Sequence, residues 1–388
     1  MTSLSGLTRR GSDEPEREFQ HAERLLLRAE RELRFLDRLL PDNLASERAR
    51  LLVEFSSGRV SEPCFEYSAA TGVERLAPFL SSISTTLAGL GPLGQLYAER
   101  ADELLLEASL LAALGSAEFR VLARARYSPP ADANGDETEA TVAQWSQAQD
   151  SEPHTERSVR ADDEHDPESL ISVLRARIGA LRVPVRVQLR EGLPAIAAAG
   201  DGFVVLRPNT WLQPSEALRI AHHELEAHVL PRLAAKRETL GIFRVGARGA
   251  GDEEEGRALL IEQRAGLFPA ARRRELSLRH RAAKMVHDGA CFAEVVRGLE
   301  AEAVPVAGAV DLALRVLRGG GLGRELVYIP AYLRLKREFA RDPSLEQWYE
   351  RGRLSLSAAR VLMSLERRAG GAVPHASFPA RAQHPAAR

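Results

Sequence analysis

Three of the ten histidines in this chain lie within seven positions, in the stretch RIAHHELEAHVL at residues 219–230. His223, Glu224 and His228 form the pattern His-Glu-x-x-x-His. Imidazole nitrogens are common ligands of Zn²⁺, and a neighbouring carboxylate that does not bind the metal can accept a proton from water. The pattern therefore indicates a candidate zinc site with hydrolytic chemistry.

The spacing of the two histidines is one residue longer than in the common pattern His-Glu-x-x-His. Five residues of an ideal α-helix turn about 500°, so the two imidazoles would point about 140° apart. Both rings can reach one ion only if the helix widens into a π-helical turn, or if its last turn is distorted near Pro231. The alternative is a helix with surface histidines and glutamates, in which His222 and Glu226 form an ordinary i,i+4 pair. This stretch alone leaves both interpretations open.

A catalytic zinc site needs a third protein ligand and an open position. The segment GDEEEGRALLIEQ, residues 251–263, supplies four glutamates: Glu253, Glu254, Glu255 and Glu262. These acids also have a purely structural explanation, because Asp252 and Glu255 have the spacing of a capping box and acids favour helix N-termini.

Taken together, HELEAHVL and EEGRALLIE resemble the flavohaemoglobin expression-modulating QEGLA-motif proteins and the related microtubule-associated tyrosine carboxypeptidases. In those proteins His-Glu-x-x-x-His-x-Leu is followed further along by Glu-Gly-Leu-Ala, and here Glu255-Gly256-Arg257-Ala258 stands in that place. Five further blocks resemble the family in the same order: LDRLLPDNLASER, PCFEYSA, LGSAEF, HRAAKM and RVLRGGGLGRELVYIPAYL.

The resemblance implies that His223, His228 and Glu255 bind Zn²⁺ and that Glu224 is the general base of a peptidase. The chemistry agrees with this assignment. Two neutral imidazoles and one carboxylate leave the Zn²⁺ complex net positive, which lowers the pKa of water at the metal and polarises a peptide carbonyl.

Two positions depart from the family pattern. Arg257 replaces a leucine in the glutamate motif, and Glu226 stands where the family usually has a glycine. Glu226 adds an acid near the predicted metal, and Arg257 adds a cation that could pair with it or bind substrate. Neither change removes a ligand, but both leave the substrate preference open.

A carboxypeptidase needs a cation for the terminal carboxylate of its substrate, ideally an arginine that binds both oxygens. The blocks HRAAK and RVLRG narrow the candidates to Arg281, Arg315 and Arg318, each of which could instead form a surface salt bridge. Tyr328 and His280 are candidate hydrogen-bond donors to the oxyanion. Their alternatives are a half-buried core tyrosine and a helix histidine with satisfied hydrogen bonds.

The elements that must position these residues are mainly helical. Apolar residues at three- and four-residue steps predict one helix from Glu16 to Pro41 and another near 92–114, so that residues 16–128 form an N-terminal helical region. Residues 166–368 form the predicted metallopeptidase core, with short strands before the metal helix. Of these, GFVVLRP is expected as the edge strand on which an extended peptide pairs. The expected fold is α+β and mainly helical, with a zincin-like core that contains a small mixed β-sheet.

Three segments lack such patterns. Residues 1–15 and the low-complexity tail 369–388 are predicted to be disordered. Residues 129–165 are rich in Pro, Ser, Asp and Glu, which predicts a flexible acidic linker or insertion with an exposed Trp145.

Composition limits the partners. The 53 basic and 54 acidic residues give a net charge of −1, so no overall field attracts nucleic acid or a membrane surface. The sequence shows neither a signal peptide nor an apolar run long enough to span a membrane. Cys64 and Cys291 give no disulfide framework and are expected to be buried fillers in a cytoplasmic protein.

The expected function is a zinc-dependent metallopeptidase, specifically a tyrosine carboxypeptidase-like enzyme that acts on a protein or peptide C-terminus. The alternative is a zinc-containing regulatory protein that modulates the expression of a partner such as flavohaemoglobin, with little or no turnover. Glu224 favours the enzyme, because a structural zinc site has no use for an unliganded carboxylate. A helical scaffold without metal is the third interpretation, and it requires the resemblance to be illusory.

Overall fold

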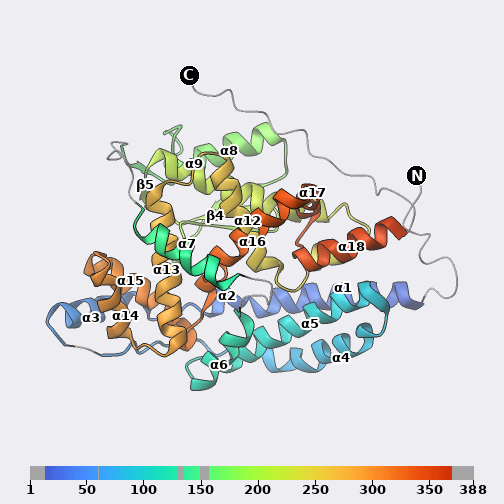
Figure 1. The fold of residues 1–388 in the computed structure, drawn as a ribbon, viewed down its shortest axis with the longest axis horizontal. Helices are drawn as coiled ribbons and strands as arrows, with labels where there is room; N and C mark the ends of the chain where they lie inside the picture. The colour runs from blue at the N-terminus through green and yellow to red at the C-terminus, as the bar shows by residue number, and fades with distance from the viewer. Residues whose placement is uncertain (1–13, 60, 129–133, 149–156, 369–388) are drawn as a thin grey trace.

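The computed structural model describes residues 14–59, 61–128, 134–148 and 157–368, which are mainly helical with two small sheets (Figure 1). Within this described part, no helix combines the length and the apolar character that crossing a membrane requires. The predictions of disorder for residues 1–13 and 369–388 fall outside the described residues. Residues 14 and 15, which were included in the predicted disorder, belong to the first helix instead.

The N-terminal region is helical, as predicted. Its helices α1 (Glu14–Leu33), α4 (Leu76–Ala88), α5 (Gly91–Ala112) and α6 (Ala117–Arg126) gather along one side of the molecule (Figure 1). The inward face of α1 consists of Ala22, Leu26, Ala29 and Leu33, which recur at helical spacing and are all buried. The helix predicted to run to Pro41 is interrupted at Arg34, whose φ of 42° is left-handed.

The larger sheet is the expected small mixed sheet, in the order β2-β4-β3. Strand β4 (Phe203–Leu206) runs parallel to β2 (Arg186–Leu189) and antiparallel to β3 (Ala197–Gly200). The prediction that GFVVLRP is an edge strand is therefore wrong, since β4 pairs on both sides. Its uninterrupted apolar run, buried from 204 to 206, is typical of a central strand. A second pair joins β1 (Val159–Arg160) to β5 (Trp211–Leu212).

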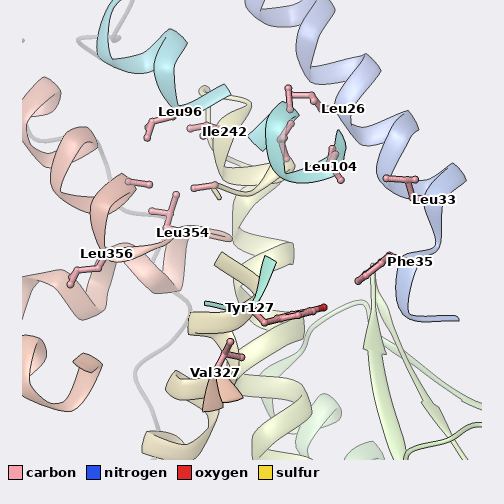
Figure 2. Close-up of a cluster of buried hydrophobic side chains, with 14 of the residues drawn as sticks. Leu26, Leu33, Phe35, Leu96, Leu104, Tyr127, Ile242, Val327, Leu354 and Leu356 are labelled. Carbon is pink, nitrogen blue, oxygen red and sulfur yellow. The ribbon is translucent and has the colours of Figure 1, made fainter. Parts of the chain in front are cut away.

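The main hydrophobic core joins segments from both halves of the chain. Leu26 and Leu33 from α1 and Leu104 from α5 lie in one cluster with Leu354 and Leu356 near the C-terminus (Figure 2). The N-terminal helices and the predicted metallopeptidase core are therefore packed on each other through one continuous apolar interior. A separate cluster packs the three-stranded sheet against the helices that precede and carry the two histidines.

Part of the segment predicted as a flexible acidic linker is a packed helix. Helix α7 (Gly135–Ser146) begins at Asn134, whose side chain caps the backbone N–H of Glu137. Trp145 is 6% exposed, and its ring centroid lies 5.4 Å from that of Phe268. The predictions of a flexible linker over 134–148 and of an exposed Trp145 are therefore wrong.

The sequence of this segment did contain a signal for the helix. Thr138, Val142 and Trp145 recur at steps of four and three residues and are the buried residues of α7. The abundant polar residues around them occupy its outer face. Residues 157–165 are ordered as well, since Val159 pairs in β1. Residues 129–133 and 149–156 of the predicted linker lie outside the described part.

Further helices complete the described part of the chain. They are α2 (Phe35–Arg38), α3 (Leu44–Ser56), η2 (Val73–Arg75), α8 (Leu170–Leu181), α9 (Pro214–His222), η3 (His223–Val229), α10 (Leu230–Ala235), α11 (Ile242–Val245), α12 (Ala250–Arg264), α13 (Ala270–Asp288), α14 (Phe292–Ala301), α15 (Val306–Leu317), η4 (Arg318–Gly320), η5 (Arg324–Leu326), α16 (Tyr328–Arg341), α17 (Ser344–Arg351) and α18 (Leu356–Arg368).

Candidate metal centre

The stretch that carries the two histidines is a π-helix. Helix α9 continues into η3, which is π-helical from His223 to Val229 and then returns to α-helix in α10. Of the two distortions predicted to bring both rings to one ion, the π-helical turn is the one observed. The imidazole rings of His223 and His228 consequently lie close together, with their centroids 5.2 Å apart.

Helix α12 packs against this π-helix and supplies a carboxylate. Ligand atoms of His223, His228 and Glu255 all lie within 4.8 Å of one another, and Nε2 of His223 is 3.6 Å from Oε2 of Glu255. Ligands of Zn²⁺ lie about 2.0–2.2 Å from the ion, so a small inward movement of these side chains would close the site. Two nitrogens and one oxygen from largely buried side chains fit a divalent metal.

Each imidazole is also held by a second carboxylate on α12. Nδ1 of His223 lies 2.7 Å from Oε1 of Glu262, and Nδ1 of His228 lies 3.2 Å from Oε2 of Glu254. Histidines that bind metals usually have such a partner on the nitrogen that faces away from the ion, because it fixes the tautomer and the ring orientation. Sequence reasoning grouped Glu254 and Glu262 with the candidate acids but missed this supporting arrangement.

The carboxylates control the charge of His223. Burial alone would lower its pKa, but the hydrogen bonds to Glu255 and Glu262 outweigh burial and raise the pKa to about 9. A metal ion would therefore have to displace a proton from His223 near neutral pH. Burial opposes ionisation of Glu254 as well, yet the charge of Arg232 and the hydrogen bond to His228 lower its pKa to about 2.

Glu224 lies beside the three-residue group but does not belong to it. The residue is buried, with 8% of its surface exposed. Its carboxylate acts on His223 through its charge, but no hydrogen bond or ion pair joins that carboxylate to any residue that the structure describes. Its carboxylate is therefore available to a bound water or substrate.

Arg324 is a site residue that the sequence reasoning did not select. Its Nη2 donates to Oε1 of Glu255 at 2.8 Å, and its guanidinium lies 5.8 Å from the centroid of the Tyr328 ring. With Oε1 held by Arg324, the other oxygen of Glu255 is left to face His223. The available signal was its place in the block RVLRGGGLGRELVYIPAYL, four residues before Tyr328.

Tyr328 begins α16 and is buried. Burial raises the pKa of its hydroxyl, Arg324 opposes this rise, and Glu255 adds to it. Tyr328 is therefore a protonated donor that lies within the electrostatic reach of Glu255. His280, in α13, is 4% exposed and its Nδ1 has no partner among the described residues. Burial lowers its pKa to about 4, so its imidazole is neutral.

The three candidate arginines differ in their partners. Arg281 is exposed and forms an ion pair with Glu302. Nε of Arg315 donates to Oε1 of Glu325 at 2.6 Å. Arg318 forms no ion pair with any residue in the described part, and its Nε is buried without a partner. Burial and the charge of Arg315 lower the pKa of Arg318 to about 10.

The two residues that depart from the family motif have structural partners. Nδ1 of His222 lies 2.8 Å from Oε1 of Glu226, so the ordinary i,i+4 pair exists beside the candidate site and does not exclude it. Nη1 of Arg257 donates to the backbone oxygens of Glu226 at 3.2 Å and Ala227 at 3.4 Å. Arg257 thus braces carbonyls of the π-helix from the facing helix α12.

The cysteines do not contribute to this site. Cys64 is exposed and Cys291 is half-buried, and both are free thiols. The expectation that both are buried fillers is therefore wrong, since Cys64 lies exposed in the segment after α3 and Cys291 is the half-buried N-cap residue of α14.

The family model for microtubule-associated tyrosine carboxypeptidases matches residues 55–375, which include the π-helix and the whole of α12. The chain therefore belongs to this family, and the resemblance seen in its motifs is to carboxypeptidases. No curated protein and no solved structure matches it.

Proposed function

We propose that this protein is a zinc-dependent metallocarboxypeptidase that removes a residue from the C-terminus of a protein or peptide. The observation that carries the proposal is the convergence of His223, His228 and Glu255 beside the buried, unbonded carboxylate of Glu224. Membership of the tyrosine carboxypeptidase family supports the type of peptide bond attacked.

His223, His228 and Glu255 would hold the metal, with Glu254, Glu262 and Arg324 fixing the orientation of their side chains. When bound, Zn²⁺ would supply a Lewis acid that polarises the scissile carbonyl and makes water more acidic.

The remaining chemistry belongs to protein side chains. The carboxylate of Glu224 can accept a proton from the attacking water and pass it to the leaving amine. The protonated hydroxyl of Tyr328 can donate to the oxygen that gains negative charge. His280 stays the weaker candidate for this role, because burial keeps its imidazole neutral and the charges that act on it are those of Lys284 and Glu325.

Arg318 is the best candidate for binding the terminal carboxylate of the substrate. Arg281 and Arg315 already have carboxylate partners, whereas Arg318 is half-buried and has none in the described part. A half-buried guanidinium without a direct ion-pair partner is costly, because the more distant charge of Glu325 offsets burial only in part, and an anion placed beside it would relieve that cost. The lowered pKa of Arg318 reflects the same imbalance.

The test is to load the purified protein with zinc and incubate it with peptides that have either free or amidated C-termini. Mass spectrometry should show loss of the last residue from the free acids, little change in the amides, and no cleavage with a chelator or with His223→Ala. Cleavage at internal bonds only, or no cleavage of any peptide, would contradict the proposal. Metal analysis of the same preparation checks zinc against iron, which a two-histidine, one-carboxylate set can also bind.

A further inference from the structure

Helix α1 lies outside the part of the chain that the family model matches, which begins at residue 55. It nevertheless packs into the main core, where Leu26 and Leu33 lie in the same cluster as Leu354 and Leu356 (Figure 2). The polar side of this contact leads toward the candidate metal centre.

A chain of hydrogen bonds runs from α1 to His228. Oε1 of Glu30 accepts from Nη1 of Arg353 at 2.7 Å, and Nε of Arg353 donates to Oε1 of Glu254 at 3.3 Å. The other oxygen of Glu254 lies 3.2 Å from Nδ1 of His228. Two further arginines bind the carboxylates of this series of hydrogen bonds. Arg100 donates to Glu30 at 3.0 Å, and Arg232 donates to Glu254 at 3.1 Å.

Arg353 lies at the centre of this series of hydrogen bonds and is itself held in place. Its backbone N–H donates to the carbonyl of Phe243, and its own carbonyl accepts from Ala247. Its side chain is 15% exposed and bridges two carboxylates, each through a different nitrogen. A planar guanidinium fixes the direction of both bonds, which a lysine ammonium does not.

We propose that Glu30 and Arg353 are positioning residues for His228, so that α1 is a functional part of the metal centre. The inference rests on the proposed function, because it assumes that His228 binds a metal. Glu254 fixes the tautomer and the ring orientation of His228, Arg353 fixes Glu254, and Glu30 fixes Arg353. Since such coupling is reciprocal, metal binding should in turn stabilise the docking of α1.

The experiment measures the dissociation constant of Zn²⁺ by competition with a chelator. Glu254→Gln should weaken binding about 10- to 100-fold, as expected for a group that contacts a ligand. Glu30→Gln should weaken it by about 5-fold or more. Glu32→Gln is the matched control, since Glu32 lies on the same helix and, within the described residues, pairs only with the exposed Arg28. The Glu32→Gln variant should bind Zn²⁺ with the same affinity as the wild-type chain.

A double variant separates positioning from general stability. If Glu30 acts through Glu254, Glu30→Gln should have no further effect on zinc affinity in the Glu254→Gln background. Hydrogen exchange gives a second readout that does not depend on cleavage. Zinc should slow exchange of the α1 amides in the wild-type chain and do so less in Glu30→Gln.

The outcomes are distinguishable. Full zinc affinity in Glu30→Gln, with weakened binding in Glu254→Gln, would overturn this inference and leave the proposed function intact. Equal losses from Glu30→Gln in both backgrounds would also overturn it, since the effect would not pass through Glu254. A wild-type chain that binds no zinc would overturn the proposed function and this inference together.

Discussion

Nδ1 of His223 lies 2.7 Å from Oε1 of Glu262, and this contact leaves Nε2 as the nitrogen that faces Glu255. Two glutamates on one helix therefore touch the same imidazole in different ways. Glu262 is completely buried and is also held by Arg272 and Arg219, whereas Glu255 shares its site with His228.

This difference predicts distinct metal phenotypes. The wild-type chain should hold about one zinc per molecule, and Glu255→Gln should lose it along with His223→Ala and His228→Ala. Glu262→Gln should still bind about one zinc per molecule at saturating zinc, but with an affinity about 10- to 100-fold lower. Metal analysis and chelator competition measure the two effects. If Glu255→Gln still bound zinc tightly and Glu262→Gln lost it, then Glu262 would be the metal ligand and Glu255 the residue that orients His223.

Glu224→Gln separates an enzyme from a zinc-containing regulator. The substitution keeps the shape of the side chain and removes the proton acceptor, so zinc content and the unfolding transition should barely change. Turnover should fall about 10²- to 10⁴-fold, equivalent to about 3–5 kcal/mol of activation barrier. Steady-state peptide cleavage measures it. A variant that retains wild-type turnover would remove Glu224 from the mechanism.

Arg318→Ala should lower kcat/KM for peptides with a free C-terminus by about 10- to 150-fold, because a hydrogen bond to a charged group is worth about 1.5–3 kcal/mol. Cleavage of the amidated peptide, already slow, should not fall further. Arg281→Ala is the matched control and should leave both rates unchanged, since Arg281 is engaged by Glu302 at the surface. An equal loss on both peptides would show that Arg318 does not recognise the carboxylate.

The lowered pKa of buried His280 predicts that the protein loses stability in acid. Its pKa in the folded chain is about 4, below the ordinary 6.5, because burial disfavours the charged ring. Between these values the unfolded chain binds a proton that the folded chain does not. The stabilisation is therefore complete above about pH 6.5 and is lost as the pH falls toward 4. Urea unfolding with a chelator present, at pH 7 and pH 4.5, should show His280→Gln losing about 2–3 kcal/mol less than the wild type. Identical losses in both would contradict the buried neutral histidine.

Trp145 tests whether the segment between the two halves is packed. Trp145→Ala should lower the free energy of unfolding by about 3–5 kcal/mol, as expected for a buried aromatic side chain. Trp211→Ala should change it by no more than about 0.5 kcal/mol, because Trp211 is 66% exposed. Denaturant unfolding measures both. If Trp145→Ala lowered the free energy of unfolding only slightly, the result would favour the flexible linker predicted from composition.

The sequence was sufficient where local spacing determines the structure. The five-residue separation of His223 and His228 excludes an ordinary α-helix for a shared metal, so a widened or distorted turn could be predicted from geometry once both histidines were taken as ligands. The apolar spacing of α1 likewise predicted its inward face. In α7 the same kind of spacing was present, but a few apolar residues among many acidic ones carried too little weight against composition.

Contacts between distant segments could not be predicted in this way. Arg324 reaches Glu255 across 69 residues of sequence, and Arg353 reaches Glu30 across 323. Such pairs depend on how the helices pack, and an arginine that binds a carboxylate has the same local sequence signal as one at the surface. The prediction that β4 is an edge strand was wrong for a similar reason, because the topology of the sheet determines which strands lie on either side of it.

The π-helix between His223 and Val229 has an evolutionary consequence. Its hydrogen bonds close over five residues where those of an α-helix close over four, so the turn takes up one extra residue. Because the excess is contained within η3, α10 keeps its contact between Arg232 and Glu254. A chain with one residue fewer between the histidines could present the same two imidazoles from an unbroken α-helix. The two histidine spacings would then be separated by a single codon.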